Sequence, residues 1–313
     1  NIFKKKYVKI LIFNILIPII LFYFILINLD FNKSIKILNK ADVTYLLISI
    51  KFALLQVIFN NLRWYFVIKQ IKNFNFFYLL RYTYIISFLN QVLPSNIGGE
   101  LYKIFITKKI ISSLPLSISI NLFEKFFVLL ILLLLILITG TFFEQTEIVW
   151  LNYIKDFIYI LIILLTGLVF ILTNFKRISF YIIILKKIEV YYNKFFSFLI
   201  HKNLVIKLLI ISAISHINLL IIFKMITISV GVNLDFLSLS FIFFVTFLLM
   251  QLPISIGGWG VREASIVSGL FILGVNATTS FIISALFGLS LLFAYLPAIF
   301  LILNRNKFKI NHH

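Results

Sequence analysis

Cysteine is absent from this sequence of 313 residues, and acidic residues are scarce, with 10 Asp and Glu against 29 Lys and Arg. Without cysteine the chain has no disulfide, no thiol nucleophile and no thiolate ligand, so we expect no metal, no redox chemistry and no cofactor. Charged residues make up 12% of the chain and hydrophobic residues 62%. Because a soluble globule could not bury so large an apolar fraction, the composition predicts a membrane protein.

The surplus of cations gives a formal net charge of +19. In so apolar a chain this surplus is typical of loops that face an anionic leaflet, and it does not indicate nucleic-acid binding. We therefore expect membrane lipids, and no nucleic acid, as partners.

Long apolar runs predict an all-α, polytopic bundle of membrane helices. A bilayer core of about 30 Å needs ~20 apolar residues in a helix. Two further apolar regions, residues 76–111 and 234–275, are interrupted by Pro and Gly-Gly, so neither can form one continuous helix. Pro297 predicts a kink in the last run. Six runs are long enough for a full span: residues 8–27, 43–62, 114–138, 157–173, 204–230 and 278–303.

The charges of the loops predict the orientation of the chain. Residues 174–207 carry seven Lys and Arg, whereas residues 141–156 carry three acidic residues and one lysine. By the positive-inside rule the first loop is cytoplasmic and the second is external. With both termini cytoplasmic, each interrupted region must then return to the side it entered from, as a re-entrant hairpin or a pair of crossings.

Two stretches refine this topology. Residues 174–203 interleave cations with aromatic residues, which predicts an interfacial helix on the cytoplasmic surface of a bacterial inner membrane. In the first external loop, Lys33, Lys36 and Lys40 break the positive-inside rule locally.

The two interrupted regions contain the same motif, Leu93-Pro94-Ser95-Asn96-Ile97-Gly98-Gly99 and Leu252-Pro253-Ile254-Ser255-Ile256-Gly257-Gly258. Pro occurs 5 times and Gly 11 times in the whole chain, so a shared Pro and Gly-Gly at one spacing indicates an internal duplication. Copies on opposite leaflets are typical of inverted repeats, whose substrate sites lie near the bilayer midplane. We expect one transmembrane domain over residues 1–313, with halves at about 43–140 (motif 93–103) and 204–303 (motif 252–263).

Ionisable residues follow both motifs inside apolar sequence. Pro ends a helix, Gly-Gly lets the backbone approach a ligand, and the next helix starts with unpaired N–H groups that favour an anion. Charges at membrane depth are costly and tend to be functional. The candidate headgroup-binding residues are Arg63, Glu100, Lys103, Glu124, Lys125, Arg262 and Glu263. The candidate helix-break residues are Pro94, Gly98, Gly99, Pro253, Gly257, Gly258 and Gly260.

A structural interpretation of the same charges is the alternative. In it, Arg262-Glu263 and Glu124-Lys125 pair across helices, and Lys103 extends to the interface. Other polar and small residues in the runs fit helix packing. His216 is interpreted as an interhelical hydrogen bonder, Gln56 and Asn60 as interhelical groups or as the lining of a cavity, and Gly269 and Gly288 as contacts within one chain or in a homo-oligomer.

The second motif and its continuation resemble a known family. Residues 252–263, which read LPISIGGWGVRE, and Leu273-Gly274-Val275 are very similar to the signature of flippase-like membrane proteins related to the transmembrane region of lysylphosphatidylglycerol synthase. The resemblance covers nearly the whole chain. The family's first motif is matched by Pro94, Gly98, Gly99 and Glu100, which resemble it. The family's early Arg-Trp pair resembles Arg63-Trp64, and its intramembrane Glu-Arg pair resembles Glu124-Lys125, with Lys replacing Arg. Lys103 also stands where Arg is expected.

This resemblance implies a multi-pass inner-membrane protein that moves an anionic or aminoacylated phospholipid, or a polyprenyl phosphate, between leaflets. Full-length synthases carry a soluble aminoacyl-transferase domain after the membrane region, and this sequence ends at His313 without one, so we expect a translocase and no enzyme. One alternative is a non-transporting accessory subunit of a separate lipid- or glycan-modifying enzyme. A remote alternative is a polyprenyl-phosphate-dependent glycosyl transferase with Asp30 or Asp42 as catalytic carboxylate.

Overall fold

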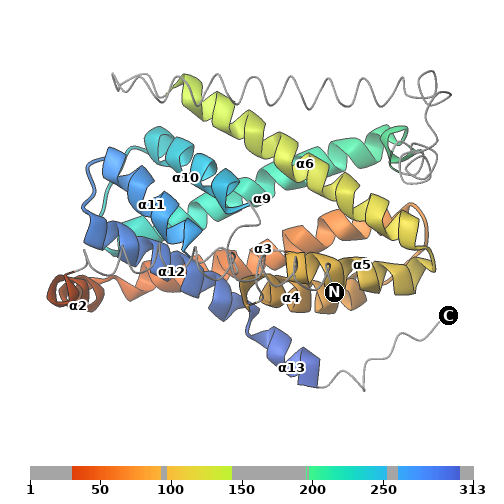
Figure 1. The fold of residues 1–313 in the computed structure, drawn as a ribbon, viewed down its shortest axis with the longest axis horizontal. Coiled ribbons are helices and arrows are strands. Elements are labelled where there is room, and N and C mark those ends of the chain that lie inside the picture. The colour runs from red at the N-terminus through yellow and green to blue at the C-terminus, as the bar shows by residue number, and fades with distance from the viewer. Residues whose placement is uncertain (1–29, 93–96, 143–194, 196, 252–259, 304–313) are drawn as a thin grey trace, which may run out of the picture. The chain divides into compact units, whose positions relative to one another are not determined.

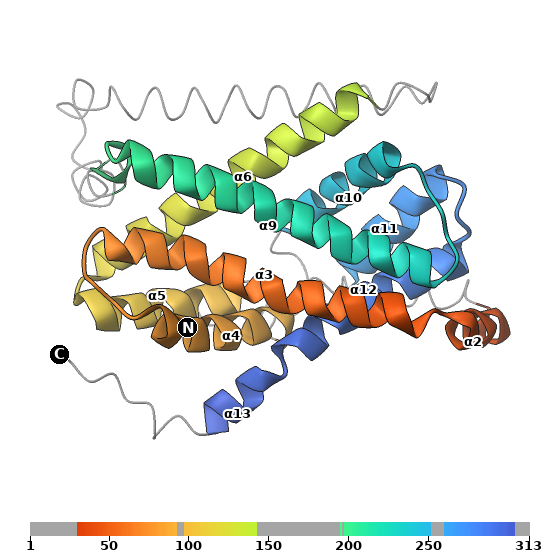
Figure 2. The same ribbon diagram turned by 180° about the vertical axis from the view of Figure 1, so that it is seen from behind.

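The computed structural model describes residues 30–92, 97–142, 195, 197–251 and 260–303, which are helical and contain no strand. The all-α prediction is confirmed for these residues (Figure 1, Figure 2). The predicted runs at 8–27 and 157–173 lie outside them, as does most of the predicted interfacial helix at 174–203. The helices are α2 (Phe31–Lys40), α3 (Val43–Lys69), α4 (Phe76–Val92), α5 (Ile97–Ile111), α6 (Leu114–Thr141), α9 (Lys202–Ser229), α10 (Phe236–Met250), α11 (Val261–Ile272), α12 (Ala277–Tyr295) and α13 (Pro297–Leu303).

Within the described part of the chain, four stretches are long and apolar enough to cross a membrane: α3, α6, α9 and the stretch Ala277–Leu303. They confirm four of the six predicted runs as helices. The last stretch comprises α12, which ends at Tyr295, and α13, which begins at Pro297. Because proline lacks an N–H group and cannot continue the helical hydrogen-bond ladder, this interruption confirms the predicted kink.

Polar side chains fix the starts of several helices. A side-chain oxygen of the residue before the helix accepts a hydrogen bond from the third backbone N–H group of the helix, which would otherwise lack a partner. At Asp235 the hydrogen bond from the Ser238 backbone N–H holds the pKa of the carboxyl below its ordinary value. The capping residues are Asp30 of α2, Ser113 of α6, Asp235 of α10 and Asn276 of α12.

The described residues form two compact units. The first unit draws on Asn1–Ile58, Phe77–Lys103 and Ile217–His313, and the second on Phe59–Phe76 and Ile104–His216. The described residues on both sides of each repeated motif belong to the first unit: 77–92 and 98–103 around the first motif, and 234–251 and 260–275 around the second.

The first unit has an aromatic core. Phe223 of α9, Phe243 of α10 and Phe287 of α12 are buried, with ring centroids 5.0 to 5.8 Å apart. Helices α10, α11 and α12 lie side by side in both views (Figure 1, Figure 2). Such ring packing contributes stability beyond the area that it buries.

Polar groups also link helices in the first unit. The Asn218 amide of α9 donates to the Phe52 carbonyl of α3 at 3.0 Å and to Gln56 Oε1 at 2.9 Å. The hydroxyls of Ser49 in α3 and Ser290 in α12 lie 3.0 Å apart. Gln56 thus acts as an interhelical hydrogen bonder, as one of the two sequence interpretations had it.

The second unit is organised in the same way. Phe123 of α6 packs against Phe127, Phe195 and Phe198, with ring centroids 5.1 to 5.3 Å apart. His216 Nε2 of α9 lies 2.9 Å from the Val128 carbonyl of α6, which confirms the interhelical role predicted for this histidine.

The first interrupted region is a helical hairpin. An added Cβ atom on Gly99 in α5 would collide with the Asn90 side chain and with the Ile86 carbonyl oxygen of α4. Residues 9 and 13 positions apart would be separated by about 13 and 19 Å in one straight helix, at ~1.5 Å per residue. The chain must therefore turn back between Val92 and Ile97, which confirms that the region is not one helix.

The second interrupted region folds back in the same manner. An added Cβ atom on Gly269 in α11 would lie 2.5 Å from Ile242 Cγ2 in α10. With 15 and 12 residues, α10 and α11 are each shorter than the ~20 residues of a full span. Gly269 makes this close contact within one chain.

The predicted first external loop contains a helix. Lys33, Lys36 and Lys40 lie on α2, and the carboxylates at its two ends cap helices. Asp30 Oδ1 accepts from the Lys33 N–H at 2.9 Å, and Asp42 Oδ1 accepts from the Thr44 N–H at 2.8 Å.

We predict that Gly99→Ala destabilises the protein more than Gly269→Ala. The new methyl group at position 99 meets a backbone carbonyl that cannot move without distorting α4, so we expect a cost of about 1–3 kcal/mol. At position 269 its nearest contacts are side-chain atoms of Ile242 and Thr246 and no backbone atom. The gain in helix propensity of about 1 kcal/mol offsets part of the strain. Denaturant titration in mixed micelles measures both, with Leu101→Ala at an exposed position as the control. An equal or larger cost at position 269 would contradict the hairpin packing.

Candidate functional site

The second motif leads into α11 through a glycine with an unusual backbone conformation. Gly260 has a φ of +84° and immediately precedes Val261, the first residue of the helix. Residues with a side chain rarely adopt this left-handed conformation, so glycine suits the position. The turn at Gly260 places the next residues of the motif, Arg262 and Glu263, in the first turn of α11.

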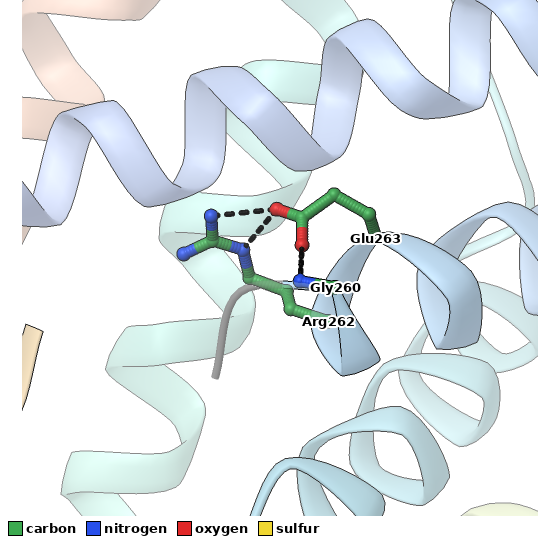
Figure 3. Close-up of polar contacts among 3 residues, drawn as sticks. All are labelled: Gly260, Arg262 and Glu263. Carbon is green, nitrogen blue, oxygen red and sulfur yellow. Dashed lines mark hydrogen bonds and ion pairs between the residues drawn. The ribbon is translucent and has the colours of Figure 1, made fainter. Parts of the chain in front are cut away.

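Arg262 and Glu263 form a buried ion pair (Figure 3). Glu263 Oε1 accepts hydrogen bonds from Arg262 Nη2 at 2.7 Å and from Arg262 Nε at 3.0 Å. The other carboxylate oxygen, Oε2, accepts a hydrogen bond from the Gly260 backbone N–H. Three N–H donors therefore converge on one carboxylate, and both side chains have a relative exposure of no more than 1%.

The charges in the first turn of α11 offset one another. The start of a helix carries a partial positive charge, which favours Glu263 and disfavours the guanidinium of Arg262 in the same turn. The Glu263 carboxylate offsets both positive charges and also caps the helix at Gly260. Because a buried charge without a partner costs several kcal/mol, the two residues depend on each other.

A glycine in the neighbouring helix makes room for the guanidinium. An added Cβ atom on Gly288 of α12 would collide with Arg262 Cζ, Nη1 and Nη2. Gly288 therefore lets α12 approach the face of the Arg262 side chain and close the site on that side. This contact lies within one chain, as one of the two sequence interpretations of Gly288 had it.

A second ion pair lies in the second unit. Arg63 Nε of α3 is 3.6 Å from Glu124 Oε1 of α6, and Arg63 Nη2 donates to Asn60 Oδ1 at 2.7 Å. Both charged side chains are buried. Lys125, which the sequence interpretation paired with Glu124, is exposed. The adjacent Trp64 is fully buried and donates from Nε1 to Thr107 Oγ1 at 3.1 Å.

The ionisable residues after the first motif lie on α5. Glu100 is half-buried and Lys103 is buried. Their spacing of three residues places them on one face of the helix. They belong to the same unit as Arg262 and Glu263.

Comparison with known families decides what kind of protein contains these sites. The family model described as the lysylphosphatidylglycerol synthase TM region matches residues 8–299. The chain belongs to this family. A comparison with curated proteins gives no match. Family membership and the four apolar helices identify a multi-pass membrane protein with a role connected to membrane lipids.

In this family member, part of the predicted helix-break motif can be located. Gly99 is buried against α4, Gly98 is half-buried in the first turn of α5, and Gly260 precedes α11. The remaining predicted residues, Pro94, Pro253, Gly257 and Gly258, lie outside the described residues.

The second unit also has a cationic hollow at its surface. A cavity of about 510 Å³ is lined by Gln70 and by residues at the start of α9, among them His201, Lys202 and Lys207. Lys207 Nζ also lies 5.1 Å from the centroid of the Phe66 ring. These cations belong to the loop predicted to be cytoplasmic. No three His, Asp or Glu side chains gather into a metal-binding group among the residues that the structure describes.

Sequence reasoning missed the roles of two residues. Asn60 was noted as a polar residue in a span, and its spacing of three from Arg63 is a signal that could have paired them on one helix face. Gly288 was noted as a packing glycine, but no local pattern indicates that its partner is Arg262, 26 positions earlier.

We predict that Gly288→Ala destabilises the protein only while the guanidinium is present. The new methyl group would displace Arg262, at a cost of about 1–3 kcal/mol. In a background of Arg262→Met with Glu263→Gln, which removes both buried charges together, the same substitution should cost little. A double-mutant cycle by denaturant titration should give a coupling energy of about 1–3 kcal/mol. Equal costs in both backgrounds would contradict the contact.

We also predict different effects for two cations near Glu124. Arg63→Gln leaves a buried carboxylate without its charge partner, so we expect a loss of about 3 kcal/mol. Lys125→Gln, at an exposed position next to Glu124, should change stability by no more than about 0.5 kcal/mol. Adding Glu124→Gln to Arg63→Gln should recover part of the loss. If Arg63→Gln and Lys125→Gln lowered the stability by similar amounts, the Arg63–Glu124 ion pair would not be the cause of the loss.

Proposed function

We propose that this protein moves an anionic or aminoacylated phospholipid, or a polyprenyl phosphate, between the leaflets of a bacterial inner membrane. The observation that carries the proposal is the convergence of three N–H donors on the Glu263 carboxylate in the interior of an apolar unit. Membership of a lipid-related membrane family gives the substrate class its support.

The donors around Glu263 are those that bind phosphate. An arginine fork and the backbone N–H at the start of a helix recognise carboxylate and phosphate oxygens alike. Glu263 therefore stands in the place that a headgroup phosphate would take. When a phosphate arrives, Arg262 and the Gly260 N–H exchange one anion for another, while the displaced Glu263 carboxylate has to reach water or take up a proton. This exchange lowers the cost of opening the site.

The first hairpin supplies the second half of the proposed route. Lys103 and Glu100 follow the first motif as Arg262 and Glu263 follow the second, and both pairs belong to one unit. If the hairpins are inverted repeats, one cation faces each leaflet, and a headgroup would be passed from one to the other. The proposed orientation has both termini in the cytoplasm.

The proposal contains no catalytic step. The transferase alternative has less support, because Asp30 and Asp42 are both engaged in capping helices. The accessory-subunit alternative is retained as an outcome of the experiment, since the Arg262–Glu263 pair also suits a purely structural role.

The test is a leaflet-resolved assay in proteoliposomes. Fluorescent phosphatidylglycerol, a fluorescent short polyprenyl phosphate and fluorescent phosphatidylcholine serve as probes, and a membrane-impermeant reductant bleaches the outer leaflet. We expect the wild type to move the anionic probes faster than phosphatidylcholine. Arg262→Lys keeps the charge but loses the two-pronged fork, and one lost charge-assisted hydrogen bond of about 1.5–3 kcal/mol corresponds to a roughly ten- to hundredfold slower rate.

Two further variants sharpen the assay. Lys103→Ala should also slow the anionic probes, whereas Lys108→Ala, an exposed lysine on the same helix, should leave the rate unchanged. Unchanged transport in both Arg262→Lys and Lys103→Ala would contradict the proposed site. A folded wild type that moves none of the probes would favour the accessory-subunit alternative, and the enzyme partner would then be sought by co-purification.

A further inference from the structure

Helix α2 presents three different faces. Lys33, Lys36 and Lys40 recur at intervals of three and four residues, which places them on one side of the helix. Ile35 and Leu38 lie on the opposite side and are 57% and 47% exposed. The half-buried residues Ser34 and Ile37 lie between these two sides, and the helix contacts α12 (Figure 2). An exposed apolar face opposite a cationic face is typical of a helix that lies in a membrane interface.

The position of α2 marks the edge of the bilayer core. Asp42, the residue before α3, donates its backbone N–H to the Ser229 carbonyl at the end of α9 at 2.8 Å. Helices α3 and α9 are both long and apolar enough to cross a membrane, so one end of each lies at this level. The C-terminal end of α2 therefore lies at the level where α9 ends and α3 begins.

The apolar face of α2 also leads into the lipid-facing side of α3. Val43 and Leu47, in the first turns of α3, are 63% and 62% exposed. Because α3 is a candidate membrane span, these side chains face acyl chains. Ile35 and Leu38 precede them in the same segment, and an exposed apolar stretch continuous with a lipid-facing helix requires the same cover.

The charge of α2 selects the kind of lipid. Its three lysines are exposed, and the two carboxylates that flank them are engaged by backbone N–H groups in helix caps. The face that remains is cationic and attracts anionic headgroups. A second copy of the chain packed on the apolar face would leave the lysines on the opposite side without an anionic partner.

We propose that α2 is an interfacial helix that buries Ile35 and Leu38 among acyl chains and binds anionic phospholipid headgroups through Lys33, Lys36 and Lys40. The helix anchors the start of α3 and gathers anionic lipid beside the protein. This surface is separate from the Arg262–Glu263 site, and its test does not depend on lipid translocation.

The absence of cysteine allows a clean test by site-directed labelling. The full-length protein carries a single fluorophore through Ile35→Cys, Leu38→Cys or, on the opposite face, Lys33→Cys. It is reconstituted into phosphatidylcholine vesicles in which about one lipid in three is phosphatidylglycerol. Brominated acyl chains are placed either on phosphatidylglycerol or on phosphatidylcholine at equal total bromine. We expect quenching at positions 35 and 38 to exceed quenching at position 33 at least about twofold, because only the apolar face enters the bilayer.

The lysines are tested in the Ile35→Cys protein with Lys33→Gln, Lys36→Gln and Lys40→Gln together. With the lysines present, brominated phosphatidylglycerol should quench more strongly than brominated phosphatidylcholine, with a local enrichment of about fivefold. The triple variant should lose this preference and keep the quenching itself.

Three outcomes would overturn the proposal. Equal quenching at positions 33 and 35 would mean that the apolar face does not enter the bilayer. A preference for phosphatidylglycerol that survives the triple substitution would mean that the lysines do not bind the headgroups. The third outcome is a label at position 35 that neither the aqueous quencher nor the brominated lipid reaches. If this shielding also rises with the protein-to-lipid ratio, a second copy covers the face.

Discussion

The neutral pair of Arg262 and Glu263 is the interaction on which the described site depends. An arginine or a glutamate buried alone in the interior of this unit would lower the free energy of unfolding by several kcal/mol. Each surrounding feature serves the pair: the left-handed Gly260 starts the helix at the right residue, the first turn of α11 favours the carboxylate, and Gly288 leaves space for the guanidinium. A polar site is thereby kept in an apolar core without a net charge.

The features that follow from local physics could be predicted from the sequence. A run of about 20 apolar residues is long enough to span a bilayer in any tertiary context, and four such runs are helices here. Proline lacks an N–H group wherever it occurs, so the kink at Pro297 could be predicted, as could the interruption of residues 76–111. The candidate residues Arg262 and Glu263 were identifiable because charges are rare in apolar sequence.

The features that depend on distant neighbours could not be predicted in the same way. Glu124 pairs with Arg63 of another helix, 61 positions earlier in the chain, and no local pattern indicates this partner. The role of Gly288 depends on which helix packs against α12. Helix α2 was taken for a loop, since ten residues with three lysines are too short and too polar for a span.

The absence of a side chain at Gly288 also restricts how α11 and α12 can shift relative to each other. On the same side of α12, the residues one turn earlier are Ser284 and Ala285, and the residues one turn later are Leu291 and Leu292. A shift of Arg262 toward the later turn would drive its guanidinium into two leucines, whereas a shift toward the earlier turn meets small side chains. The α12 face is therefore sterically asymmetric about Gly288, with smaller side chains one turn earlier than one turn later.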